Sequence, residues 1–147
     1  KDQRPTVLHQ SGEKQIAQLR MSYATAGVEA QLLPFINDVA SAMAQADVLI
    51  CRAGASTVCE IAAVGVASVL VPFPFAVDDH QSANARFLSE AGGAWLCPQE
   101  VLTPQSLAAQ VQAWSRPQLM VYAIESKKHE KLGAAQVMAA ECENLLL

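Results

Sequence analysis

The stretch DVLICRAGASTVCEIAAVGVASVLV, residues 47–71, decides the fold class. It begins with an apolar run at 47–52 and then passes through a turn of small residues around Gly54. A helical segment at 56–64 follows and ends at Gly65, and a second apolar run occupies 67–71. Two apolar runs joined by a helix are typical of parallel strands with a crossover connection. This stretch therefore predicts a strand–helix–strand unit.

The same alternation continues on both sides of this unit. Further strands are predicted at 5–9, 30–34 and 94–97, and helices at 13–26, 37–46, 80–91 and from Thr103-Pro104 onward. From about 117 to 147 the chain is helical in character, with breaks near 127–130 and at Gly133. Alternating strands and helices predict an α/β fold, a parallel sheet with helices on both faces. The 147 residues fit one domain.

Composition and charge exclude several classes of protein. The formal charge of −4 and pI near 5.3 give no basic surface for nucleic acid. Of the residues, 52% are hydrophobic, but no uninterrupted apolar run approaches the roughly 18 residues of a membrane-spanning helix. The start KDQRPTVLHQSG lacks the pattern of a secretory signal. The four cysteines lack metal-type spacing, so we expect them to be reduced and no metal to be bound.

The strongest candidate site is the segment CRAGASTVCE, residues 51–60. Gly54 and Ala55 permit close approach of a ligand to the backbone, and Ser56 and Thr57 add hydroxyls beside the unpaired amides of a helix start. Such a start carries a partial positive charge that suits a diphosphate. Glu60, one turn further in, would instead accept hydrogen bonds from a neutral diol. The alternative is structural: Ser56 caps the helix, Thr57 is an exposed first-turn residue and Glu60 complements the helix dipole.

Two weaker candidates follow other strands. The loop and helix entrance at 72–85 gather polar groups, among them Gln81, although Asp78 or Asp79 could simply cap a helix. Ile36 could offer main-chain groups and an apolar face to a planar base, although a core position is the simpler interpretation. The HQSG segment at 9–12 ends the first strand and could line the same cleft, or form a plain turn.

These motifs together resemble one family. CRAGASTVCEIAAVGVASVLVPFPFAVDDHQSANARFLSEAGGA at 51–94, with HQSG, PFINDVASAMAQADVLICR and AWSR, is similar to the MurG family of glycosyltransferases. The resemblance implies transfer of N-acetylglucosamine from its uridine diphosphate carrier (UDP-GlcNAc) to lipid I, which makes lipid II for peptidoglycan. It also implies two Rossmann-like domains in the arrangement called GT-B. This chain would be the C-terminal, donor-binding half, and the acceptor domain with the proposed catalytic base would be absent from it.

The resemblance also implies roles for particular residues. Ile36 would contact uracil through its main chain, and Gln81 would reach the sugar hydroxyls. The diphosphate would be approached by Ala55, Ser56 and Thr57, and the segment would be completed by Val58 and Cys59. Glu60 would bind the ribose hydroxyls. Arg52 matches an arginine of the family that has no assigned role. Ser56, Cys59 and His80 depart from the residues common in relatives. No catalytic residue, metal or cofactor is expected in this chain, since UDP-GlcNAc is the donor substrate.

The implied partners are UDP-GlcNAc, lipid I through the acceptor domain, and the cytoplasmic face of the bacterial inner membrane, bound peripherally in the whole protein. We expect the chain alone to bind the donor weakly and to transfer no sugar. Two alternatives stay open from the sequence. One is another enzyme of the same fold that acts on a uridine nucleotide sugar, such as a UDP-GlcNAc 2-epimerase. The other is a non-catalytic flavodoxin-like interaction domain.

Overall fold

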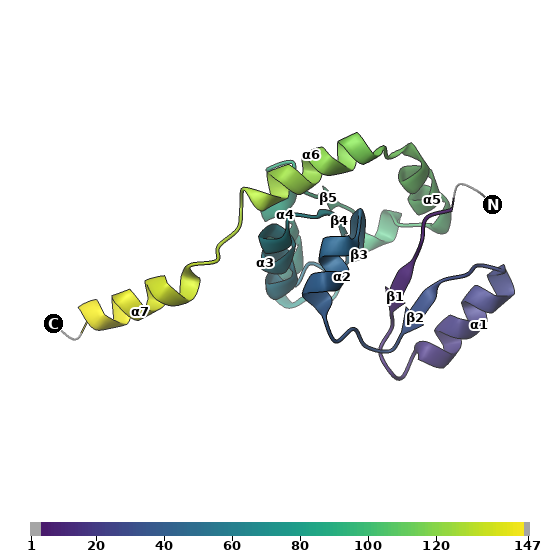
Figure 1. The fold of residues 1–147 in the computed structure, drawn as a ribbon, viewed down its shortest axis with the longest axis horizontal. Coiled ribbons are helices and arrows are strands. Elements are labelled where there is room, and N and C mark those ends of the chain that lie inside the picture. Colours follow the sequence, from purple (N-terminus) through teal and green to yellow (C-terminus); the bar gives the residue numbers. More distant parts are fainter. Residues whose placement is uncertain (1–3, 146–147) are drawn as a thin grey trace. The chain divides into compact units, whose positions relative to one another are not determined.

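The computed structural model describes residues 4–145 (Figure 1). The chain divides into two compact units, one up to Ala42 and one from Met43 onward. No helix within the described residues is long and apolar enough to cross a membrane.

The first unit is a parallel strand pair with one helix. β1 (Leu8–Gln10) pairs with β2 (Gln31–Leu33), so that His9 lies opposite Leu32. α1 (Ile16–Ala26) connects them and lies beside β2 (Figure 1). It ends at Gly27, whose left-handed backbone (φ 60°) turns the chain back toward β2. The carboxyl ends of both strands therefore meet at one edge of this unit.

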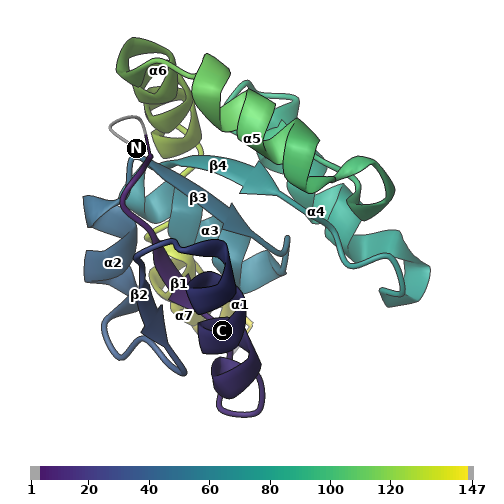
Figure 2. The same ribbon diagram turned by 90° about the vertical axis from the view of Figure 1, so that its right-hand side faces the viewer.

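The second unit is a three-stranded parallel sheet with its crossover helices. Its strands are β3 (Val48–Cys51), β4 (Ala67–Leu70) and β5 (Trp95–Leu96), in the order β3-β4-β5. β3 and β4 lie side by side in Figure 2. Its helices are α3 (Ala55–Val64), α4 (His80–Ser89), α5 (Pro104–Ala113), α6 (Arg116–Lys127) and α7 (Ala134–Asn144), and α2 (Val39–Gln45) runs across the boundary between the units. Short 3-10 turns occupy Val77–Asp79 and Gln99–Val101.

The core of the second unit is built around β4. All four residues of this strand are buried, because it lies in the middle of the sheet and is covered on both faces. Ile61 of α3, Leu70 of β4 and Leu88 of α4 are each 0% exposed and belong to one hydrophobic cluster. α6 packs against β4 and α3. The predicted class, parallel strands with helices on both faces, is confirmed.

Several element boundaries differ from the prediction for identifiable reasons. The first strand lies at 8–10 instead of 5–9, because the parallel pairing begins opposite Gln31. The helix predicted at 37–46 starts at Val39, because the Asp38 side chain accepts the Ser41 amide at 2.9 Å. The helix predicted at 80–91 ends at Ser89, before Gly92 with its left-handed backbone. The strands form two parallel sheets, not one. That residues 1–147 are a single domain stays a prediction, and 1–3 and 146–147 lie outside the described residues.

Candidate functional site

The start of α3 exposes its first-turn amides. Gly54 is the N-cap, with an extended backbone and no side-chain hydrogen bond to the helix start. The first helical bond runs from the Val58 amide to the Gly54 carbonyl at 3.0 Å. The amides of Ala55, Ser56 and Thr57 therefore have no carbonyl within the helix to bind. Ala55 and Ser56 are exposed and Thr57 is half-buried, so an anion can reach this end of the helix.

The alternative interpretation of Ser56 as the helix cap is wrong. Ser56 lies two residues after the Gly54 cap, inside the first turn of the helix, and is exposed. Thr57 follows at the third position of the helix and is half-buried, so the structural alternative is right about its place in the first turn and wrong about its full exposure. The first turn thus combines backbone donors with two hydroxyl groups, which is the chemistry that the sequence predicted for this segment.

The next turn of α3 divides between core and surface. Val58 is 3% exposed and packs into the hydrophobic cluster, so its side chain is not available to a ligand. Cys59 and Glu60 are exposed. Glu60 lies four residues after Ser56 and thus on the same side of the helix. None of the ion pairs among the described residues involves Glu60, which leaves its carboxylate able to accept hydrogen bonds from a ligand.

Arg52 gains a structural role that the sequence left open. Its guanidinium donates to the carbonyls of Val71 at 3.3 Å and Pro72 at 3.0 Å, and to Oε1 of Gln99 at 2.6 Å. It also lies over the Phe73 ring, 5.4 Å from the ring centre. Arg52 thereby joins the carboxyl end of β3 to the segments that follow β4 and β5. It positions the loops at this sheet edge.

Gln81 and Asn84 hold the same edge from α4. Oε1 of Gln81 accepts the Phe73 amide at 3.0 Å, and Nδ2 of Asn84 donates to the Ala53 carbonyl at 3.1 Å. Because the Gln81 carboxamide oxygen is already used, its amino group is the part able to meet a ligand hydroxyl. Asp79 is the N-cap of α4, but it has a left-handed backbone (φ 50°) and makes no side-chain capping bond. Asp79 therefore occupies the cap position that the structural alternative predicted, but its side chain does not cap the helix.

A polar hollow opens at the carboxyl ends of β4 and β5. Its volume is about 240 Å³, and it is lined by Pro72, Phe73, Pro74, Asp79, Ser82, Pro98, Gln99 and Glu100. Asp79 was expected in this region from the sequence, whereas Gln99 and Glu100 were not. The predicted order of strands could have indicated both residues. They follow the fifth strand, and the carboxyl ends of neighbouring parallel strands meet at one edge of a sheet.

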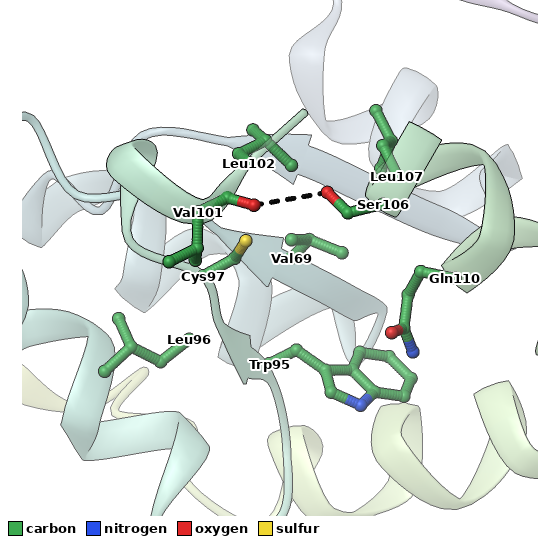
Figure 3. A pocket seen from close by; sticks show the side chains of 9 residues that line it. All are labelled: Val69, Trp95, Leu96, Cys97, Val101, Leu102, Ser106, Leu107 and Gln110. Carbon is green, nitrogen blue, oxygen red and sulfur yellow. Dashed lines mark hydrogen bonds between the residues drawn. The ribbon is translucent and has the colours of Figure 1, made fainter. Parts of the chain in front are cut away.

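A second cavity is apolar and lies between the sheet and α5 (Figure 3). It has about 220 Å³, and it is lined by Val69, Trp95, Leu96, Cys97, Val101, Leu102, Ser106, Leu107 and Gln110. Of its two polar side chains, Ser106 and Gln110, the Ser106 hydroxyl already donates to the Val101 carbonyl at 3.2 Å. No charged side chain lines this cavity, so it offers nothing to a diphosphate.

Ile36 belongs to the first unit, whereas the other predicted site residues belong to the second. It is half-buried, and its amide donates to Oε1 of Gln10 at 2.8 Å. The backbone amide at this position, in the loop between β2 and α2, therefore forms a bond with a side chain from the end of β1. The predicted contact of Ile36 with a base stays a prediction.

The cysteines and acids provide no reactive or metal-binding cluster in the described part of the chain. No group of three or more His, Cys, Asp or Glu side chains there could hold a metal ion. All four cysteines are free thiols. Burial raises the pKa of Cys51 to about 11, so this thiol stays protonated at neutral pH and is a poor nucleophile. What this sheet edge can do chemically is bind an anion and hydroxyl groups.

Comparison with known proteins agrees with this chemistry. The model of the glycosyltransferase family 28 C-terminal domain matches residues 1–140. A protein of Paracidovorax citrulli is 56% identical over 98% of this chain and 41% of its own length. One from Azoarcus is 57% identical over 97% of this chain and 40% of its own length. Both are named UDP-N-acetylglucosamine–N-acetylmuramyl-(pentapeptide) pyrophosphoryl-undecaprenol N-acetylglucosamine transferase.

A solved structure gives the same result. The crystal structure of Acinetobacter baumannii MurG superposes with a TM-score of 0.86 at 42% identity, over 92% of this chain and 42% of that one. The resemblance inferred from the sequence motifs is confirmed, and the chain spans about two fifths of the length of the relatives it matches. From the match over residues 1–140, the chain belongs to the family of glycosyltransferase family 28 C-terminal domains.

Proposed function

We propose that this chain is the donor-binding part of an inverting glycosyltransferase that moves N-acetylglucosamine from UDP-GlcNAc to lipid I and forms lipid II. The observation that carries the proposal is the uncapped start of α3, where the amides of Ala55, Ser56 and Thr57 can receive a diphosphate. The relatives described above are named as N-acetylglucosamine transferases, which favours transfer over epimerisation. They also favour an enzyme over an interaction domain.

In this proposal the chain stabilises the leaving group. The acceptor hydroxyl loses its proton to a base and attacks the anomeric carbon, while the bond from that carbon to the diphosphate oxygen breaks and UDP leaves. Negative charge develops on the diphosphate as the bond breaks, and the amides and partial positive charge at the start of α3 stabilise it. The base and the acceptor site would come from residues outside this chain, because the relatives are more than twice as long.

The remaining residues would orient the donor. Glu60 would accept hydrogen bonds from the ribose hydroxyls, and the amino group of Gln81 would meet a sugar hydroxyl. Ile36 would contact the uracil through its main chain, and Cys59 would flank the diphosphate segment. Arg52 would act indirectly, by holding the loop after β4 in place. The nucleotide sugar is the substrate, and the proposal assigns no metal or cofactor to this chain.

The proposal extends to the cellular setting. Lipid I is held in the membrane, so the whole protein would work at the cytoplasmic face of the bacterial inner membrane as a peripheral protein. Peptidoglycan synthesis, and through it cell shape and division, would depend on the reaction. Since the acceptor site would lie outside this chain, we expect the 147 residues alone to transfer no sugar, and transfer by them would contradict this part of the proposal.

Calorimetric titration with UDP-GlcNAc tests the proposal, with Glu60→Ala alongside. We expect saturable binding that the substitution weakens by about 1.5 kcal/mol or more, because a charge-assisted hydrogen bond is lost. The direction of the change in affinity is informative. If Glu60 made no hydrogen bond to the ligand, removing its negative charge near a diphosphate would strengthen binding. Glu141→Ala, an exposed acid on α7, is the matched control and should leave the affinity unchanged. Absence of binding by the folded chain would contradict the proposed function.

A further inference from the structure

One hydrogen bond in the first unit joins two segments that are far apart in the sequence. Gln10, at the end of β1, accepts the Ile36 amide through its side-chain oxygen at 2.8 Å, across 26 residues. Two backbone bonds run beside it, from the Ser11 amide to the Leu33 carbonyl at 3.2 Å and from the Gly12 amide to the Pro34 carbonyl at 3.0 Å. The backbone of this edge is thus already held by main-chain bonds without the Gln10 side chain.

The group that occupies the Ile36 amide is chemically informative. A glutamine carboxamide places a carbonyl oxygen next to an N–H, and uracil presents the same pair along its carbonyl and ring N–H edge. Cytosine and adenine do not have a carbonyl beside a ring N–H on their pairing edge. The Gln10 side chain is exposed, so a single hydrogen bond holds it and its displacement costs little.

We infer that Gln10 occupies, in the free chain, the point on the Ile36 backbone that binds a base with a carbonyl beside an N–H, and that it competes with that base. The inference rests on the proposed function, which brings a uridine nucleotide to this chain. It adds a residue that the proposed site did not include. It also predicts the direction of the change in affinity. Because the nucleotide must displace the Gln10 side chain, removing the carboxamide strengthens nucleotide binding instead of weakening it.

The test compares Gln10→Met with the unaltered chain by titration with UDP and with cytidine diphosphate (CDP). Methionine keeps the length of the side chain and removes the carboxamide. We expect the affinity for UDP to rise about fivefold, the equivalent of one hydrogen bond of roughly 1 kcal/mol, and the affinity for CDP to stay unchanged. The control is Gln18→Met on α1, which makes the same chemical change at an exposed position. The Gln18 side chain makes no hydrogen bond to the described residues, so this variant should alter neither the affinity for UDP nor that for CDP.

Amide exchange supplies a readout that does not depend on affinity. The Ile36 amide should exchange faster in Gln10→Met than in the unaltered chain, and UDP should slow it again in the variant. If Gln10→Met binds UDP no more tightly, or if UDP leaves the Ile36 amide exposed, the inference is overturned while the proposed function stands. If the unaltered folded chain binds no UDP, the proposed function fails and the inference fails with it.

Discussion

Replacing Ala55 with aspartate should lower the affinity of this chain for UDP by about 30-fold or more, while the folded state becomes no less stable. Ala55 is the exposed first residue of α3, directly after the Gly54 cap. A carboxylate there complements the helix start and stabilises the helix by about 0.3–1 kcal/mol. The same charge repels a diphosphate, at about 3 kcal/mol for two unit charges 5 Å apart near a protein surface. Stability and binding should therefore change in opposite directions.

A matched control separates this local effect from the change in net charge. Gln105→Asp places the same charge in the first turn of α5, a helix that the proposal does not assign to the nucleotide. We expect this variant to bind UDP as the unaltered chain does. Calorimetry measures the affinity and thermal unfolding measures the stability of each variant. A less than twofold loss of affinity in Ala55→Asp would rule out the start of α3 as the diphosphate site.

Gly93→Ala should destabilise the second unit by about 1–3 kcal/mol, because the added methyl group has no space. A Cβ at Gly93 would lie 2.8 Å from both the backbone nitrogen and the Cα of Ser126 in α6. Backbone atoms cannot rotate away as a flexible side chain can, so α6 would have to move from its place against β4. Urea unfolding followed by circular dichroism measures the loss of free energy.

Gly133→Ala is the corresponding control. A Cβ at Gly133 meets no atom within 4 Å, and its φ of −90° is compatible with alanine. We expect a change within about 1 kcal/mol there, as for an ordinary substitution at a helix start. Equal stability of Gly93→Ala and the unaltered chain would show that α6 does not pack tightly over this glycine.

The strand and helix pattern was predictable because it depends on local signals. Apolar runs bounded by small residues specify β3 and β4, and Gly65 ends α3 in a left-handed conformation as a C-terminal glycine should. Thr103 caps α5 ahead of Pro104, with its hydroxyl accepting the Ser106 amide at 3.0 Å. The pairing of strands into two sheets depends on long-range register, which these local signals do not carry.

The site was predictable only in part, for the same reason. The start of α3 could be located from Gly54 and the small residues after it, since a helix start is a local feature. The role of Arg52 could not, because its partners lie 19, 20 and 47 residues further along the chain. The left-handed backbone of Asp79 could not be predicted either, because an aspartate before a helix is compatible with several backbone conformations. Contacts made by folding decide these features.

Backbone amide spectra of the isotopically labelled chain during titration with UDP test the central claim most directly. If the start of α3 binds the diphosphate, the amide signals of Ala55, Ser56 and Thr57 shift saturably, and with the same dissociation constant that calorimetry gives. If those three signals stay in place while the chain is folded and UDP is in excess, the diphosphate does not bind there, and the account of this site is wrong.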